Sequence, residues 1–118
     1  MYVLTSARSF SGGEGLAYLL QDMKRATVVG ERTAGAANPG RPYPLTERLE
    51  VVVPNGQVLT AASRTNWEGT GVTPDIVTPE AEALRVAHLD SVQSLVRQAP
   101  SEAARAALEK VLAALREP

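Results

Sequence analysis

The residues best suited to chemistry lie in the stretch SFSGGEG, from Ser9 to Gly15. Ser11 has two interpretations there. It is either the cap of a following helix, because Ser-Gly-Gly-Glu fits a capping box with Ser11 at N-cap and Glu14 at N3, or a nucleophile at the mouth of that helix. The positive end of the helix dipole would favour its alkoxide, and the Gly12 amide would stabilise a tetrahedral oxyanion. The local pattern alone favours the cap, since most such matches are nothing more.

The predicted elements around this stretch would place Ser11 in the connection between a strand and the helix that follows it. Residues 2–5 are a short apolar run typical of a buried strand, and residues 26–30 are a β-branched strand closed by glycine. Between them, residues 12–24 have helical periodicity. A strand, a helix and a strand with short connections predict a βαβ unit in a parallel sheet. The apolar face of the helix would comprise Leu16, Leu19, Leu20 and Met23.

The rest of the chain predicts a long loop, a β-hairpin and two helices. Residues 31–44 are rich in glycine and proline, and a loop of this length in a compact domain is usually functional. A hairpin is expected from strands 49–53 and 58–61 around an Asn55-Gly56 turn. Beyond residue 78, two helical stripes meet at Pro100-Ser101. We therefore expect an α/β core over residues 1–78 and an appended helical hairpin over residues 79–118.

Composition excludes several classes of function. The 12 basic and 13 acidic residues give a net charge of -1 without long runs of either sign, which argues against a nucleic-acid surface. With no cysteine and one histidine, we expect neither a metal site nor a cofactor. The sequence predicts no membrane span and no targeting segment. The compartment stays undetermined, and export of the parent protein stays open.

Two ordered segments carry a resemblance to a known family. They are VLTSARSFSGGEGLAYLLQDMKRATVVGERTAGAANPGR and, after it, NWEGTGVTPDI. Together they closely resemble the C-terminal-processing (tail-specific) serine peptidase family, over about Tyr2 to Val77. Within that family the sequence is most similar to the branch of tricorn core protease and the interphotoreceptor retinoid-binding protein modules. The resemblance implies a crotonase-like fold of ββα superhelical units, of which this chain would be a part.

The resemblance also implies roles for individual residues. Ser11 falls where the family places its nucleophile, and Gly12 where it supplies one oxyanion-hole amide. Relatives that use a lysine base read Thr-x-Gly-Lys after the second strand, but here the same positions are Thr33, Ala34, Gly35 and Ala36. A Ser-Lys dyad of the usual kind is therefore ruled out. The tricorn-like branch instead uses an upstream histidine with a glutamate before Gly-Val-x-Pro-Asp, a position that Glu68 matches.

The remaining candidates each have a structural alternative. His88 lies beyond the resemblance on the apolar face of a helix, where a packed core or interface histidine is the better interpretation. Glu68 could be an exposed loop acid, although the resemblance favours an assisting role. Arg41 could hold a substrate carboxylate, with a solvated loop arginine as the alternative. We also expect substrate contacts at Gly35 and Ala36.

Two functions of different kinds follow. In the first, the chain is part of a serine endopeptidase that cleaves peptide or protein substrates through an acyl-enzyme on Ser11. The chain would be inactive by itself, because a serine without a base is a poor nucleophile. The second is a non-catalytic module for apolar ligands of the retinoid or fatty-acid type, with Ser11 only a cap. Since a partial domain leaves strand edges and apolar surface open, we also expect a homo-oligomer.

Overall fold

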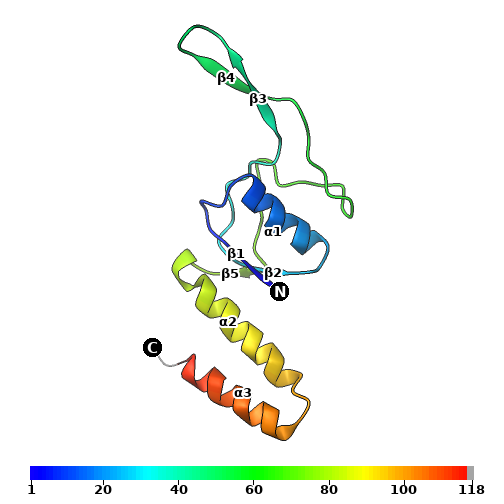
Figure 1. Cartoon of the computed structure of the whole chain (residues 1–118), viewed down its shortest axis with the longest axis vertical. Coiled ribbons are helices and arrows are strands. Elements are labelled where there is room, and N and C mark those ends of the chain that lie inside the picture. The colour runs from blue at the N-terminus through cyan, green and yellow to red at the C-terminus, as the bar shows by residue number, and fades with distance from the viewer. Residues whose placement is uncertain (117–118) are drawn as a thin grey trace.

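The computed structural model describes residues 1–116 as a chain of mixed helix and strand (Figure 1). A three-stranded sheet has the order β1-β2-β5, with β1 at Tyr2–Thr5, β2 at Thr27–Gly30 and β5 at Ile76–Val77. Both pairings are parallel. Helix α1, Gly12–Asp22, connects β1 to β2. The strand–helix–strand prediction with parallel strands is therefore confirmed.

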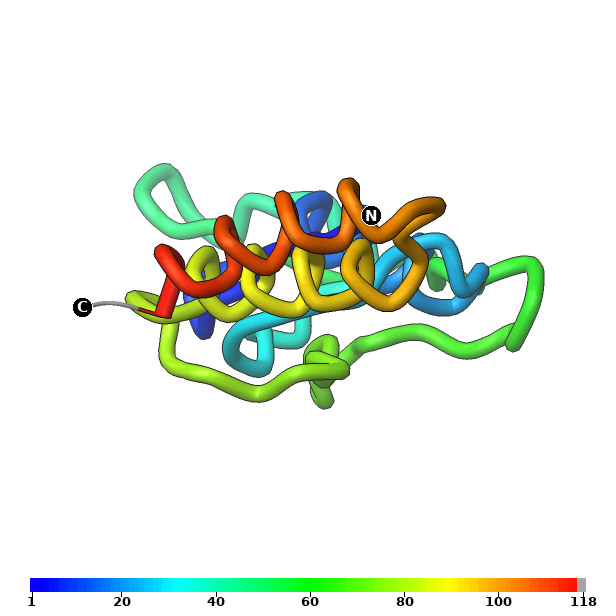
Figure 2. The backbone as a smooth tube through the Cα atoms, turned by 90° about the horizontal axis from the view of Figure 1, so that it is seen from below, coloured from blue at the N-terminus to red at the C-terminus, as the bar shows by residue number. Residues whose placement is uncertain are grey.

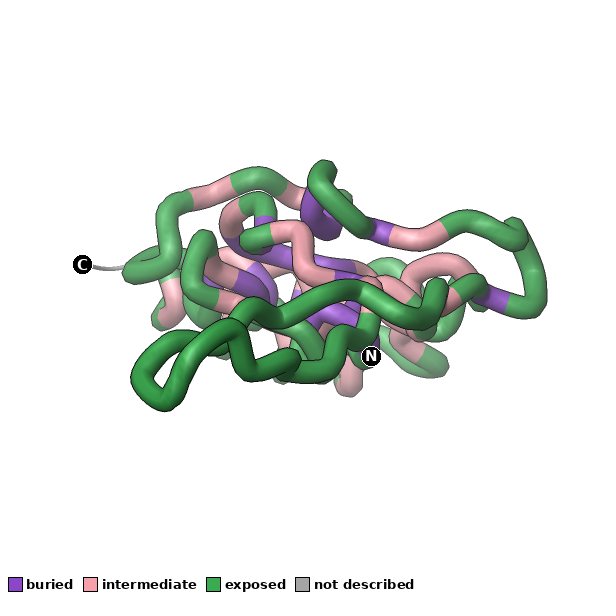
Figure 3. Tube along the Cα trace, turned by 90° about the horizontal axis from the view of Figure 1, so that it is seen from above, coloured by how far each residue is buried: buried purple, intermediate pink, exposed green. Residues whose placement is uncertain are grey.

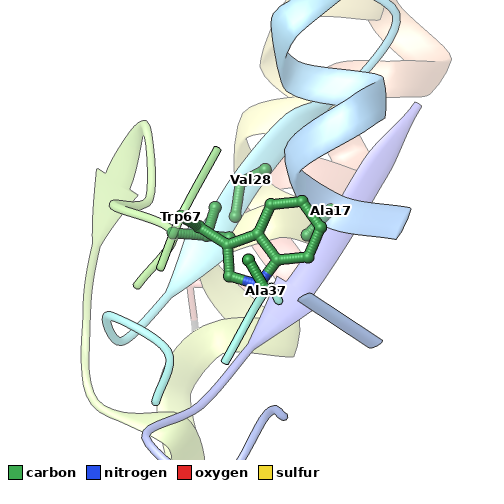
Figure 4. Packing of buried hydrophobic residues seen from close by; sticks show 5 residues of the cluster. Ala17, Val28, Ala37 and Trp67 are labelled. Atoms are coloured by element: carbon green, nitrogen blue, oxygen red, sulfur yellow. The ribbon is translucent and has the colours of Figure 1, made fainter. Parts of the chain in front are cut away.

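The sheet is covered on both faces. Neighbouring residues of β2, Val28 and Val29, are both inaccessible to solvent, and successive side chains of a strand point to opposite faces. On one face Val28 packs with α1 and the indole of Trp67 (Figure 4). On the other face Val29 packs with helix α2, Glu80–Arg97. The first cluster contains Ala17, Val28, Ala37, Trp67 and Val72, and the second contains Val29, Ala83 and Ala87.

Helix α1 packs mainly through Glu14, Gly15 and Ala17 and not through the predicted leucine stripe. Its buried positions are Glu14, Gly15 and Ala17, whereas Leu16 and Met23 are 59% and 53% exposed. Gly15 allows this close approach, since a Cβ there would lie 3.2 Å from the Trp67 ring. Of the predicted apolar stripe, Leu16, Leu19 and Met23 are therefore left exposed, and Leu20 is half-buried.

The predicted hairpin is wrong in its pairing. The observed hairpin joins β3, Gly40–Pro44, to β4, Glu50–Pro54, with Pro42 opposite Val52. Residues 58–61 form no strand, and the Asn55 N–H donates to Pro39 O at 3.0 Å instead of opening a turn. The glycine- and proline-rich segment was expected to be a loop, but an edge strand accepts proline because its outer N–H groups need no partner. Every residue of both strands is exposed.

The C-terminal part consists of α2 and a second helix, α3, at Glu102–Ala114, which lie side by side (Figure 2). The Tyr2 hydroxyl donates to Asp90 Oδ2 at 2.7 Å and so ties α2 to β1. Ser101 caps α3 and accepts the Ala104 N–H at 3.2 Å. Helix α3 has no buried residue. None of the helices in residues 1–116 is both long and apolar enough to cross a membrane.

The molecule is elongated and exposes more surface than a compact domain of its size. Its radius of gyration is 19.3 Å, whereas a compact domain of this length has about 13.5 Å. Its accessible surface is 8037 Å², against about 6200 Å² for a compact protein of this mass. Figure 3 shows the buried positions gathered in the middle, with long exposed stretches around them. The excess of roughly 1,800 Å² is comparable to a whole protein–protein interface.

Candidate active site

Ser11 has a backbone conformation that ordinary helix caps do not adopt. Its φ and ψ are 50° and -115°, on the left-handed side that residues other than glycine rarely occupy. Ser101, the cap of α3, provides the comparison within the same chain: it is extended, at -151° and 160°, and its hydroxyl accepts a helix amide. The Ser11 side chain faces the Glu14 N–H in a capping box, but within the described residues its hydroxyl makes no cap hydrogen bond of the kind that Ser101 makes. Strained residues of this kind cluster at active sites.

Ser11 and Gly12 line a pocket of about 250 Å³ beside the start of α1. Gly12 is the first residue of the helix, so its N–H is one of the amides without an intrahelical acceptor. The Trp67 indole lines the pocket and donates from Nε1 to Ala36 O at 3.2 Å. A hydroxyl, a free helix amide and a small apolar hollow thus lie together. The remaining lining residues are Gly15, Ala37, Asn38, Pro39 and Val58.

Glu68 reaches the edge of this pocket through the loop that follows β2. Its Oε2 accepts the N–H groups of Ala37 and Asn38, each at 2.7 Å. Both of those residues line the pocket together with Ser11. The carboxylate of Glu68 is exposed, so it is accessible to a group that approaches from solvent. The structure therefore brings Ser11, Gly12 and Glu68 to one region.

Glu14 is the carboxylate most closely connected to Ser11. Its Oε2 accepts the Ser11 N–H at 2.8 Å, which is the glutamate half of the predicted capping box. The same side chain is inaccessible to solvent and also accepts the amides of Gly35 and Ala36, at 2.7 and 2.9 Å, and the Thr33 hydroxyl. Burial raises the pKa of Glu14, but these four hydrogen bonds outweigh burial and hold it below its ordinary value of 4.5.

Other predicted site residues are placed apart from the pocket or are used within the fold. The N–H groups of Gly35 and Ala36 are engaged by Glu14, and the Gly35 carbonyl accepts the Gly69 N–H at 2.9 Å. Arg41 is exposed in β3 and does not line the pocket. A role of these three residues in substrate binding stays a prediction.

His88 lies on α2, which covers the face of the sheet opposite to α1 (Figure 1). It is exposed and lines a separate pocket with Leu84 and Leu115, which Ser11 does not enter. The exposed position shows that the packed core interpretation of His88 is wrong, and an interface role stays a prediction. Within residues 1–116, no three His, Cys, Asp or Glu side chains come together as a metal site.

Sequence reasoning missed the long-range half of the site. Glu14 was identified only as a local cap, because nothing in S-x-x-E shows that the same carboxylate also holds a loop about twenty residues away. Thr33 was not singled out either, although its hydroxyl donates to Glu14 and accepts the Val72 N–H at 2.7 Å. One available signal was that GERTAG, which contains Thr33, and GTGV, which contains Val72, both lie in the segments that carry the family resemblance. That signal could have indicated that these two segments meet at the site.

Comparisons with known proteins agree with the resemblance to a peptidase family. The model of peptidase family S41 matches residues 1–78. The photosystem II D1 C-terminal processing protease is 29% identical, with a TM-score of 0.56 over 67% of this chain and 20% of that one. Mature CPAF complexed with lactacystin is 26% identical, with a TM-score of 0.61 over 82% of this chain and 20% of that one. The chain thus spans about a fifth of the length of these solved structures.

Proposed function

The chain belongs to peptidase family S41, and on that premise we propose that it carries the nucleophile of a serine endopeptidase. The observation that carries the proposal is the strained backbone of Ser11, which lines a pocket at the start of α1. Ser11 Oγ forms a bond to the scissile carbonyl carbon and gives its proton to a base. The C–N bond then breaks, the base protonates the leaving amine, and water hydrolyses the acyl-enzyme.

Gly12 would supply one donor of the oxyanion hole. Its amide lies at the positive end of α1 and lines the same pocket as Ser11. A preorganised N–H directed at the developing negative charge lowers the barrier to acyl transfer by several kcal/mol (~2.7–4 for one donor). Because Gly12 has no side chain, a substrate backbone can approach this amide closely.

The base would be a histidine from a segment outside residues 1–118, as the tricorn-like resemblance implies. Position 36, where the lysine-using relatives carry their base, is alanine. Glu68 would orient or electrostatically support the incoming histidine, because its exposed carboxylate is anchored at the rim of the pocket. By this proposal the 118-residue chain is inactive by itself. Gly35, Ala36 and Arg41 would contact the substrate.

The fold around Ser11 would be a partial crotonase-like core over residues 1–78, followed by a helical hairpin over residues 79–118. Support comes from the parallel βαβ unit that presents Ser11, from the family match, and from α3, which packs on α2. The division at residue 78 separates these segments along the chain only, because α2 packs on the sheet through Ala83 and Ala87.

We expect the 118-residue chain to self-associate. Its accessible surface exceeds that of a compact monomer by an interface-sized area, and the exposed apolar residues include the outer stripe of α1 and the valines of β4. Light scattering at micromolar concentration should give the mass of a dimer or a larger assembly. A monomeric mass would contradict this prediction.

The proposed chemistry is tested by covalent labelling. In the full-length natural chain that contains this sequence, a fluorophosphonate should label Ser11, and mass spectrometry of the digested protein should locate the adduct on the peptide that bears it. Ser11→Ala should abolish labelling, whereas Ser101→Ala should leave it unchanged because Ser101 only caps α3. Labelling of another serine, or none in the folded full-length chain, would overturn the proposal.

Binding of an apolar ligand stays the alternative. The pocket beside Ser11 has about 250 Å³, which is below the range of about 300–1,000 Å³ typical of small-molecule sites. The size of this pocket favours a single apolar side chain over a retinoid. The separate pocket that His88, Leu84 and Leu115 line has about 750 Å³ and lies within that range, so an apolar ligand would bind there instead.

A further inference from the structure

Glu14 is the only charged side chain that is buried within the described residues. A carboxylate removed from water is stable only where donors replace the solvent. Four donors do so, and all are neutral: the hydroxyl of Thr33 and the amides of Ser11, Gly35 and Ala36. The two ion pairs of residues 1–116, Arg8–Glu80 and Arg85–Glu82, do not include it.

The donors come from two separate parts of the chain, and a third part is linked through one of them. Oε2 joins the N-terminus of α1, through the Ser11 N–H, to the loop at Ala36. Oε1 accepts from Gly35 and Thr33. The Thr33 hydroxyl in turn accepts the Val72 N–H at 2.7 Å, so the turn that carries Glu68 belongs to the same network.

We propose that Glu14 is the positioning residue that keeps the Ser11 hydroxyl available for reaction. The inference rests on the proposed function and adds to it a reason why Ser11 keeps a left-handed backbone although it belongs to a capping box. By holding the Ser11 N–H, the carboxylate fixes the direction of that amide and with it the φ of 50°. Released from Glu14, Ser11 relaxes to the extended geometry of Ser101, in which the hydroxyl is held by a cap hydrogen bond from a helix amide.

This positioning depends on the ionised form of Glu14. Because its folded-state pKa lies below the ordinary value of 4.5, its contribution to stability is complete above that pH and is lost as the pH falls through the folded pKa. A protonated carboxyl or an amide cannot serve four donors, since one of its positions is itself a donor.

The experiment compares Glu14→Gln with Asp75→Asn. Asp75 is a suitable control because it also accepts a backbone amide, that of Val28 at 2.7 Å, and a side-chain amide, that of Gln21, but has no contact with the Ser11 pocket. Two quantities are measured: hydrogen exchange of the Ser11, Gly35 and Ala36 amides in the 118-residue chain, and the rate of fluorophosphonate labelling in the full-length natural chain.

Glu14→Gln should speed exchange at these amides and slow labelling of Ser11, each by about tenfold or more, as expected for lost hydrogen bonds to a charged acceptor. The Val28 and Val29 amides should keep their protection, and Asp75→Asn should leave Ser11 labelling unchanged. Unchanged exchange at Ser11, or faster exchange with undiminished labelling, would overturn the positioning role while the proposed function stands. Absence of labelling in the unsubstituted full-length chain would overturn the proposed function itself.

A second pair of variants covers the case in which Glu14→Gln does not fold. Thr33→Val removes one hydroxyl donor but keeps the volume, and Thr33→Ser restores the hydroxyl. In a carbon-13 NMR titration, Thr33→Val should raise the pKa of Glu14 and slow Ser11 labelling, and Thr33→Ser should return both toward the original values. Equal values for the two variants would overturn the network, because a purely structural role of Thr33 would not move the titration of Glu14.

Discussion

Replacing Ala36 with lysine should raise the rate at which a fluorophosphonate labels Ser11 in the 118-residue chain by at least about a hundredfold, as expected for a positioned base. Ala36 and Ser11 both donate their amides to Oε2 of Glu14, at 2.9 and 2.8 Å, so the two residues lie against a single oxygen atom. A lysine at this position would restore the Thr-x-Gly-Lys pattern of the lysine-using relatives. The gain should increase with pH, because only the neutral amine accepts the serine proton.

The matched control is Ala34→Lys. It adds the same charge and length two residues earlier, at an exposed position whose amide bonds to Ser9 O at 3.1 Å and not to Glu14. Labelling of this variant should stay at the level of the unsubstituted chain. If both lysines accelerate labelling equally, the effect is non-specific and position 36 does not face the nucleophile. If neither does, Ser11 is not arranged for attack in this chain.

Replacing Gly71 with alanine should destabilise the chain far more than replacing Gly69. The two glycines have nearly the same φ, 70° and 68°, so the backbone strain of alanine is matched. A Cβ at Gly69 would meet open space, whereas one at Gly71 would collide with the Thr33 carbonyl oxygen. We expect a loss of about 1 kcal/mol for Gly69→Ala and about 2–4 kcal/mol for Gly71→Ala.

Urea denaturation followed by Trp67 fluorescence would measure both losses. Since Gly71 packs against Thr33, the Gly71 variant should also slow labelling of Ser11 in the full-length chain, while the Gly69 variant should not. Equal losses of stability in the two variants would show that strain dominates and that the contact between residues 33 and 71 is loose.

The sequence predicted those elements that local periodicity encodes. Strand β1, helix α1 and strand β2 were expected within one or two residues, because their apolar spacing and the closing glycine are local signals. The partner of β4 was predicted wrongly for two reasons. Two prolines made β3 resemble a loop, and Asn55-Gly56 resembles the turn of a hairpin with the residues that follow it. The buried face of α1 was also missed, because Trp67, distant in sequence, decides which side of that helix packs.

The residues of the candidate site could be proposed from the sequence, but their conformation and hydrogen bonds could not. Ser11, Gly12 and Glu68 came from the capping pattern and the family resemblance, and the structure places them around one pocket or at its edge. The left-handed backbone of Ser11 is not readable from residue types, since a serine before two glycines is compatible with an ordinary cap. The partners of Glu14 are set by tertiary contacts that no local pattern encodes.

The conformation of Ser11 has an evolutionary consequence. Glycine adopts a positive φ without the penalty of about 1–2 kcal/mol that a side chain incurs. A lineage with no use for the hydroxyl would therefore gain stability by drifting to glycine at this position. Selection for stability alone would therefore replace Ser11, with its φ of 50°, by glycine. Selection for a reactive hydroxyl would keep the serine.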